Sequence, residues 1–406
     1  MRIVYVGETF YPFVKGGAER RFYEIGRRFA AAGHEVHWYA SRGWDAPETT
    51  RSLEGMTLRG VCPPLDLYHR EGRRAITSAL RLSLAAARAL WRDREVVRKA
   101  DVIDCSLYPF FHILLARLLF RRKPIVITWH EYWGEHWHEY LGWRGAIGKL
   151  VERLTARAGT HLVPVSELAR DGLSSFGADP RRMTIIRNGV DTGAIQAISP
   201  AGDDVDLIYF GRLKNHKNVD QTLRAVALLR ARWPGISLLV IGSGPEETKL
   251  KDLARTLGIE RNVTFTGSID RYEEVIARVK RAKLFVHPST KEGGGSITLL
   301  EANACGLPAI VVRHPMGVDP SLVQDGRNGF WAEDLSPPAI AAVIERCLDD
   351  VGLLGSMRFA SVAFAAESDW SEIAKATAKV YERFAPPAPK PAATAIPASI
   401  DSVISG

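Results

Sequence analysis

Basic and glycine residues stand at several predicted strand ends of this chain, where they could neutralise a phosphorylated ligand. Arg212 and Lys217 follow an apolar run that ends at Gly211. Gly16-Gly17 and Gly293-Gly294-Gly295-Ser296 each precede a helical pattern, and the free N–H groups and positive dipole of a helix start favour anions. Arg offers a planar fork and Lys a point charge, a pair suited to a diphosphate. Taken singly, each feature is better explained as a turn or a solvated charge, but together they indicate phosphate binding.

Dinucleotide and metal chemistry fit the sequence less well. Gly242-Ser243-Gly244 follows a predicted strand, but Glu247 stands where a dinucleotide fingerprint has its third glycine, and no P-loop is present. Asp204-Val205-Asp206 precedes its strand, whereas ligands bind at the carboxyl ends of strands. We therefore interpret it as linker charge. The run from His130 to Tyr140 fits no zinc spacing, so we expect neither a metal nor a cofactor.

Short apolar runs alternate with helical patterns along the chain, which predicts parallel sheets covered by helices on both faces. A length of 406 residues also exceeds what one core usually organises. We therefore predict an α/β protein of two doubly wound, Rossmann-like domains that face each other across a cleft. The predicted strands span residues 3–7, 36–40, 102–106, 125–129, 162–166, 184–187, 206–211, 237–241, 263–266, 284–287 and 308–312.

The expected domain boundaries follow this alternation. Residues 1–195 form the first domain and 196–364 the second, with Asp191–Asp204 as the linker. Helical periodicity over 336–349 and 356–385 predicts two more helices, and the part over 365–385 could pack back on the first domain. The Pro/Ala-rich residues 386–406 are expected to be a disordered tail. Four scattered cysteines, no apolar run long enough to span a membrane and no secretory signal predict a cytoplasmic protein.

The positive charge is confined to the first half of the chain. Residues 1–195 hold 30 Lys and Arg against 21 Asp and Glu, whereas the remainder holds 24 against 25. Part of the excess lies at helical spacing on one face or in a short run, at Arg74, Arg81, Arg88, Arg92, Lys99 and Arg121-Arg122-Lys123. Such a face suits an anionic membrane surface, or it is an ordinary solvated helix face. No nucleic-acid-binding motif accompanies it.

Six ordered motifs resemble those of the retaining, nucleotide-sugar-dependent glycosyltransferases of family 4, which have the GT-B fold. The resemblance spans residues 1–385. The motifs are Gly16-Gly17-Ala18-Glu19, Val165-Ser166, Asn188-Gly189-Val190-Asp191, Gly211-Arg212 with Lys217, Glu292, and Glu301-Ala302-Asn303-Ala304-Cys305-Gly306-Leu307-Pro308.

The resemblance assigns a role to each matching residue. Arg212 and Lys217 would neutralise the donor diphosphate, Glu301 would bind the ribose hydroxyls and His130 would lie beside the anomeric carbon. Glu292 would contact the donor sugar, although it stands nine residues before Glu301 rather than the family's eight. We expect the glycine loop to absorb the extra residue. The implied catalytic residues are His130, Arg212, Lys217 and Glu292, and the implied donor-binding residues are Gly16, Gly17, Arg212, Lys217, Gly294, Gly295, Ser296, Ile297 and Glu301.

The implied activity is metal-independent transfer of a hexose from a nucleoside-diphosphate sugar to an acceptor hydroxyl, with retention of configuration. The acceptor would be a glycan, a glycolipid or a lipid-linked saccharide, and the enzyme could be peripheral on the inner face of the cytoplasmic membrane. Tyr132, Trp133 and Trp137 would form an acceptor platform or part of the core. A nucleotide-sugar epimerase of similar fold and a non-catalytic nucleotide-sugar binder are the alternatives. The sequence predicts no oligomeric state.

Overall fold

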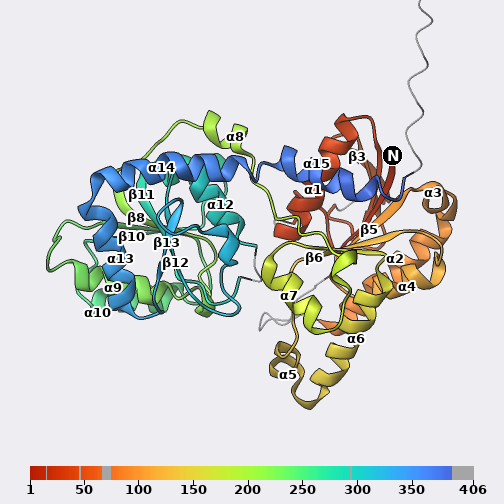
Figure 1. Ribbon diagram of the computed structural model, residues 1–406, viewed down its shortest axis with the longest axis horizontal. Coiled ribbons are helices and arrows are strands. Elements are labelled where there is room, and N and C mark those ends of the chain that lie inside the picture. Colours follow the sequence, from red (N-terminus) through yellow and green to blue (C-terminus); the bar gives the residue numbers. More distant parts are fainter. Residues whose placement is uncertain (15, 45–46, 66–74, 293–294, 386–406) are drawn as a thin grey trace, which may run out of the picture.

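Figure 1 shows a computed structural model of the chain, which describes residues 1–14, 16–44, 47–65, 75–292 and 295–385. Two lobes lie side by side, one coloured red to yellow and the other green to blue, so the chain completes most of one before it builds the other. Each lobe contains its own sheet. The predicted architecture of two doubly wound α/β domains is therefore confirmed.

The first sheet has seven strands in the order β3-β4-β2-β1-β5-β6-β7. All neighbours run parallel except β3 and β4, which pair antiparallel at one edge. Its strands are β1 (Arg2–Val6), β2 (Glu35–Ala40), β3 (Thr50–Leu53), β4 (Met56–Gly60), β5 (Val102–Ser106), β6 (Ile125–Trp129) and β7 (His161–Pro164).

The second sheet has six strands in the order β10-β9-β8-β11-β12-β13, all parallel. From the neighbouring strands β8 and β11, the strand order runs outward in opposite directions. Doubly wound sheets bind ligands beyond the strand ends at such a switch point. Its strands are β8 (Val205–Phe210), β9 (Leu238–Ile241), β10 (Val263–Gly267), β11 (Ala282–His287), β12 (Ala309–Val312) and β13 (Gly329–Ala332).

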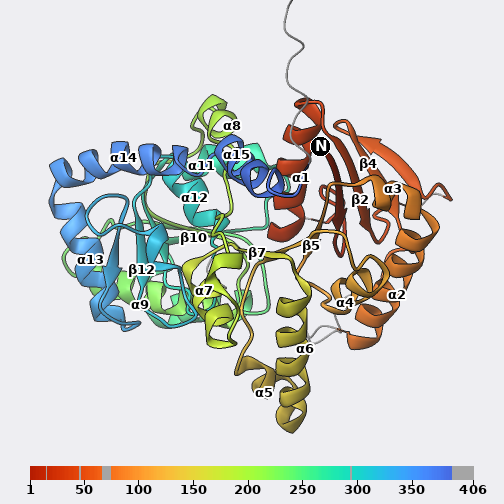
Figure 2. The ribbon, with the colours of Figure 1, turned by 45° about the vertical axis from the view of Figure 1, so that its right-hand side comes forward.

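Helices cover both faces of each sheet. The first domain contains α1 (Gly17–Ala31), α2 (Ile76–Arg92), α3 (Arg94–Lys99), α4 (Phe111–Leu119), α5 (His136–Leu141), α6 (Gly145–Ala158) and α7 (Glu167–Ser175). The second contains α9 (Val219–Leu229), α10 (Glu247–Thr256), α11 (Tyr272–Val279), α12 (Ile297–Ala304), α13 (Pro337–Asp349) and α14 (Val351–Ala366), and α8 (Thr192–Ala197) lies between the domains. Figure 2 shows α5 and α6 extending below the rest of the first domain.

The strand β1 shows why its sequence is apolar without alternation. Ile3 and Tyr5 pack in the core beneath α1, whereas Val4 and Val6 pack in the core on the opposite face of the sheet. All four side chains are buried. A strand buried on both faces requires apolar residues at every position, and the prediction of a parallel sheet depended on that pattern.

The C-terminal helix α15 (Trp370–Tyr381) leaves the second domain and packs against α1 of the first. Its Tyr381 hydroxyl donates to the buried carboxylate of Asp104 in β5, which also accepts a bond from Thr128 at 3.0 Å. Burial raises the pKa of Asp104 to about 7 despite these bonds. This network attaches the end of the described chain to the core of the first domain.

Three details of the predicted elements were wrong. Residues 184–187 form no strand. The N–H groups of Thr184 and Ile186 bond to carbonyls of β7, but Pro164 of β7 has no N–H with which to form a bond in the opposite direction. The helix predicted over 356–385 is two helices, separated at Glu367–Asp369. The predicted basic helical face is interrupted at Asp93 between α2 and α3. The segment predicted as the linker includes α8, which Asp191 caps. The predicted tail at 386–406 lies outside the described residues.

Candidate functional site

A buried carboxylate and two basic side chains meet beyond the ends of β8 and β11. The Lys217 ammonium donates to Glu292 Oε1, and His287 Nε2 lies 2.9 Å from the same oxygen. The Glu292 side chain is 8% exposed. Burial alone would raise its pKa, but His287 and Lys217 outweigh burial and hold the pKa of Glu292 well below its usual range. Glu292 is therefore ionised at neutral pH despite its burial.

Arg212 lies in the same strand-end region but has a different environment. It follows Gly211, whose positive φ of 147° turns the chain away from β8. The Arg212 side chain is exposed, whereas Lys217 is largely buried beside Glu292. The two cations expected to act together thus differ: Lys217 is held by a carboxylate, and Arg212 remains accessible to a ligand.

Glu301 on α12 joins the two domains. Arg20 on α1 donates to Glu301 Oε1 at 2.6 Å, and the Tyr272 hydroxyl donates to the same oxygen at 2.8 Å. The Arg20 guanidinium also lies over the Tyr272 ring at 5.1 Å. A carboxylate can accept about four hydrogen bonds. Ribose binding, the role that the resemblance implies for Glu301, would therefore use the second oxygen of its carboxylate.

The glycine motif of the first domain lies against the start of α12. A Cβ atom on Gly17 would be 3.3 Å from Ile297 Cδ1, and one on Gly295 would be 2.7 Å from Asn188 Nδ2. Asn188 also donates to the Gly295 carbonyl at 3.3 Å. Gly16 is the N-cap residue of α1. The starts of α1 and α12 therefore approach each other at the domain interface.

Ser296 does not cap α12 through its side chain. It occupies the N-cap position, but its hydroxyl lies 3.3 Å from His287 Nε2 and 3.1 Å from Thr298 Oγ1. The nearby imidazole attracts the hydroxyl away from the helix N–H groups. Gly293 and Gly294 lie outside the described residues.

The β6–α5 segment of the first domain also faces the second domain. His130 directly follows β6 and is half-buried. Six residues later, His136 Nε2 lies 2.7 Å from the Lys291 ammonium, which is next to Glu292 in the chain. His130 is therefore on the segment that contacts the Glu292 loop, at the carboxyl edge of the first sheet.

The three aromatic residues predicted to form an acceptor platform separate in the structure. Trp133 and Trp137 pack together with ring centroids 4.7 Å apart and line a pocket. Tyr132 instead packs against Phe176 and bonds to Ser175 at the end of α7. Tyr132 therefore lies apart from Trp133 and Trp137, because consecutive residues in this extended loop point to opposite sides. The acceptor role of the three residues stays a prediction.

A buried carboxylate on α6 holds this aromatic loop in place. Glu152 is fully buried and accepts hydrogen bonds from the Trp133 and Gly134 N–H groups and from the Trp137 indole, at 2.9–3.1 Å. Burial raises the pKa of Glu152 to about 7, although the three donors oppose the rise. The loop geometry thus depends on one side chain.

Sequence reasoning missed several residues of this interface. His287 is the last residue of β11, a strand-end position that could have suggested it, and Arg20 directly follows the Gly16–Glu19 motif. Asp319 offered no local signal: its buried carboxylate accepts from the N–H groups of Glu167 and Leu168 at the start of α7, at 2.5 and 3.2 Å. It caps a helix of the other domain, a contact that no spacing predicts.

The Asp204-Val205-Asp206 sequence lies at the amino end of β8, away from the site. Asp204 pairs with Arg281 at 2.9 Å and Asp206 with Lys283 at 2.8 Å. Among the described residues there is no cluster of three or more His, Cys, Asp or Glu side chains arranged to hold a metal. No helix in the described part of the chain is long and apolar enough to cross a membrane.

Two family models match successive parts of the chain. "Glycosyltransferase Family 4" matches residues 15–194 and "Glycosyl transferases group 1" matches residues 192–358. A glycogen synthase of Mycobacterium tuberculosis is 29% identical over 405 residues, which cover 94% of each chain. D-inositol 3-phosphate glycosyltransferase 2 of Catenulispora acidiphila is 33% identical over 237 residues, 54% of this chain and 53% of the relative.

Solved structures share the fold at low sequence identity. Anabaena HepE with UDP superposes with a TM-score of 0.72 at 18% identity, over 94% of this chain and all of that one. Sucrose-phosphate synthase from Thermosynechococcus elongatus gives a TM-score of 0.75 at 16% identity, over 94% and 99% of the chains. The fold is therefore GT-B, and the family models identify the chain as a glycosyltransferase. The chain is a member of the family-4 type of these enzymes.

Proposed function

We propose that this protein transfers a hexose from a nucleoside-diphosphate sugar to an acceptor hydroxyl with retention of anomeric configuration. The observation that carries the proposal is that the starts of α1 and α12 meet at the domain interface beside His287 and Glu292. Lys217 contacts Glu292 from the loop after β8, and Arg212 belongs to the same loop. Two cations and two helix N-termini suit a diphosphate. In our proposal the second domain binds the donor and the first binds the acceptor.

The donor class is also supported by the relatives. HepE is described in complex with UDP and with UDP-glucose, and a mannosyltransferase relative from Mycolicibacterium smegmatis is described as GDP-mannose-dependent. Both donors are nucleoside-diphosphate hexoses. Because their bases differ, the relatives support the donor class but not one base.

The chemistry of the site follows from where charge develops. Breakage of the bond between the sugar and the β-phosphate leaves negative charge on the departing phosphate. Arg212 and Lys217 would stabilise that charge, and fixed donors in a water-poor site are more effective than the same groups in water. These cations supply the positive charge, so we propose a reaction without a metal.

Retention requires that the acceptor attack on the face that the phosphate leaves. We propose a front-face displacement in which the departing phosphate accepts the proton of the acceptor hydroxyl. Glu292, held ionised by Lys217 and His287, would bind the hydroxyls of the donor sugar rather than attack it. His130 would lie beside the anomeric carbon and help to position the sugar.

The experiment combines a double variant with product analysis. Arg212→Ala with Lys217→Ala should lower transfer at least ~100-fold, whereas Arg224→Ala, an exposed cation on α9, should leave it unchanged. NMR of the wild-type product made in EDTA should show the anomeric configuration of the donor. Near-normal transfer by the double variant, an inverted product or loss of activity in EDTA would each contradict part of the proposal.

A further inference from the structure

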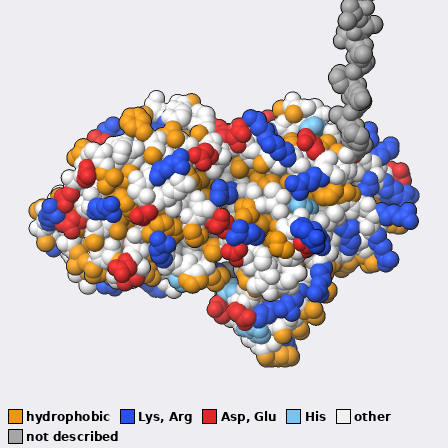
Figure 3. All heavy atoms as spheres, in the orientation of Figure 1, with side chains coloured by type: hydrophobic (Ala, Val, Ile, Leu, Met, Phe, Trp, Pro, Cys, Tyr) orange, Lys and Arg blue, Asp and Glu red, His pale blue; other side chains and the backbone are white. Residues whose placement is uncertain are grey.

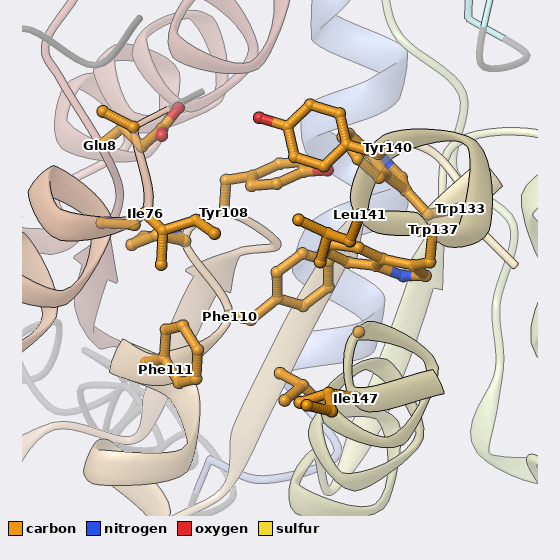
Figure 4. Close-up of a pocket in the computed structure, with 15 residues that line it drawn as sticks. Glu8, Ile76, Tyr108, Phe110, Phe111, Trp133, Trp137, Tyr140, Leu141 and Ile147 are labelled. Carbon is orange, nitrogen blue, oxygen red and sulfur yellow. The ribbon is translucent and has the colours of Figure 1, made fainter. Parts of the chain in front are cut away.

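An apolar pocket of about 180 Å³ lies in the first domain, away from the proposed diphosphate site. Figure 4 shows aromatic and aliphatic side chains pointing into it from several elements. Its wall includes Ile76, Tyr108, Phe110, Trp133, Trp137 and Ile147, and among the described residues that line it Glu8 is the one acid. A cavity of about 150 Å³ with such a lining stays dry and binds small apolar molecules. The pocket therefore suits a hydrocarbon better than a sugar.

The pocket connects the carboxyl edge of the first sheet with the outer surface. Glu8, Tyr108 and Trp133 follow β1, β5 and β6, so one end lies at the strand ends where the acceptor is proposed to bind. Trp133 also packs on His136, which contacts Lys291 beside Glu292. Ile76 on α2 and Ile147 on α6 line the other end and are both at least half exposed.

Two exposed apolar stripes begin at that outer end. The exposed apolar residues on α2 are spaced by four, four and seven residues. Those on α6 and the turn before it are spaced by four, three and four, so each set lies on one helix face. Every member is between 42% and 80% exposed. The residues are Ile76, Leu80, Leu84 and Trp91 on α2, and Trp143, Ile147, Leu150 and Leu154 on or beside α6. Exposed apolar area of this extent marks an interaction surface.

Most of the charge beside the stripes is positive. The helix α2 contains no Asp or Glu, and Arg81, Arg88 and Arg92 are exposed next to its apolar stripe. The acid in α6, Glu152, is buried inward, whereas Arg153 and Arg157 are exposed. Figure 3 shows hydrophobic atoms at the lower tip, over α5 and α6, and basic atoms gathered at the right-hand end of the first domain. The exposed acids Glu135, which pairs with Lys149 of α6, and Glu139 lie on or beside α5. Apolar residues flanked by a majority of cations complement an anionic bilayer.

We propose that the surface formed by the two apolar stripes, on α2 and α6, lies on an anionic bilayer. In this proposal the pocket holds the first part of the hydrocarbon chain of a lipid-linked acceptor. The inference deepens the proposed function and rests on it for the role of acceptor. A chain entering between Ile76 and Ile147 would present its head group at the strand ends of the first domain. The membrane would supply the acceptor, and the pocket would select a lipid-linked hydroxyl over a free sugar.

The first test measures chain binding without any donor. Farnesyl phosphate, dodecyl phosphate and inorganic phosphate would be titrated while tryptophan fluorescence is followed, since Trp133 and Trp137 line the pocket. We expect one or both chain-bearing probes to bind, the better one identifying prenyl or acyl preference, and inorganic phosphate not to. Ala79→Phe, which fills the pocket, should weaken binding at least 10-fold, whereas Ala85→Phe on the same helix but outside the pocket should not. Unchanged binding by Ala79→Phe, or no chain binding, would overturn the proposal.

The second test measures the surface. Co-sedimentation with vesicles of phosphatidylglycerol and phosphatidylcholine should require the anionic lipid and weaken as salt increases. Leu80→Glu with Leu84→Glu should abolish it, whereas Leu228→Glu, equally exposed on α9, should not. If the double variant sedimented with vesicles as well as the wild type, the proposed membrane-binding surface would be wrong. Because neither test contains a donor, failure here leaves the transferase proposal intact, and failure of transfer leaves these binding results interpretable.

Discussion

Burial and the neighbouring side chains have opposite effects on the pKa of Glu292. Its neighbours Lys217 and His287 hold it ionised although burial alone would favour the protonated form. The contact with Glu292 also holds the Lys217 ammonium in place. In our proposal, Glu292 thus positions a cation for the phosphate and itself binds the donor sugar. The extra residue between Glu292 and Glu301 does not prevent Glu292 from reaching the strand-end region.

Replacement of Glu292 by Gln tests this assignment. The amide removes the negative charge and releases Lys217, so we expect kcat to fall by ~100-fold and the donor KM to rise. Steady-state kinetics over a donor series would measure both. Glu260→Gln, an exposed acid of the same domain, is the control and should match the wild type. If kcat and donor KM were unchanged in Glu292→Gln, the residue would have no role in the site.

Site residues that belong to one short sequence motif were predictable, whereas contacts between distant parts of the chain were not. Gly17, Arg212, Lys217, Glu292 and Glu301 lie near one interface, and their motifs indicated them because each belongs to one short strand-end loop or helix start. Their partners were not predictable, since Arg20 with Glu301 and Lys291 with His136 are separated by more than 150 residues. Such pairings depend on the placement of whole domains, which local periodicity does not encode.

At the scale of elements, α6 fixes the aromatic loop through one carboxylate. Glu152 has a pKa of about 7 in the folded protein, against about 4.5 for an unperturbed Glu. Between these values the folded state keeps a proton that the unfolded state releases. The free energy of unfolding should therefore decrease as pH rises from about 4.5 to about 7.

Glu152→Gln isolates this contribution from that of Asp104, whose pKa is raised in the same direction. We expect the pH-dependent loss of stability over that window to shrink by up to about 3 kcal/mol. Urea unfolding at pH 5 and pH 7.5 would measure it for the variant, the wild type and Glu95→Gln, an exposed control. An unchanged pH dependence in Glu152→Gln would show that the carboxyl is already ionised at neutral pH.

Elements were predicted well where burial imposes a pattern and poorly where it does not. The apolar runs of β1, β5, β6 and β8 identified the two sheets, because each is covered on both faces. The edge strand β3, Thr-Arg-Ser-Leu, is mostly exposed and carries no such pattern. The pocket was also not predictable, since its wall combines residues from α2, α4, α5 and α6 that only tertiary packing brings together.

At the scale of the molecule, the two domains are held in contact by a set of polar bonds. Arg20 bonds to Glu301, Asn188 to Gly295, Asp319 to the start of α7 and Lys291 to His136. The Arg20 and Glu301 side chains are only 16% and 6% exposed. Closure of two domains around substrates commonly completes such sites, and these bonds favour the closed arrangement before any donor binds.

Arg20→Ala tests the contribution of that contact to closure. Removing one partner of a largely buried, hydrogen-bonded charge pair costs about 2–5 kcal/mol, enough to lower the closed population and kcat at least ~10-fold. Small-angle scattering should show a larger radius of gyration, and kinetics the lower kcat. Arg2→Ala breaks an exposed pair with Glu35 and should change neither. Wild-type scattering and kcat in Arg20→Ala would show that other contacts suffice.

One assay tests the central claim, that this enzyme transfers sugar from a nucleotide donor to an acceptor, most directly. Labelled nucleotide sugars would be incubated with the protein in EDTA, with and without lipid-linked saccharides, and nucleoside-diphosphate release and the position of the label followed. We predict release that depends on the acceptor, with the label on the acceptor. An altered donor formed without acceptor would identify an epimerase, and a donor bound but never consumed would identify a binding protein; either result would contradict the account.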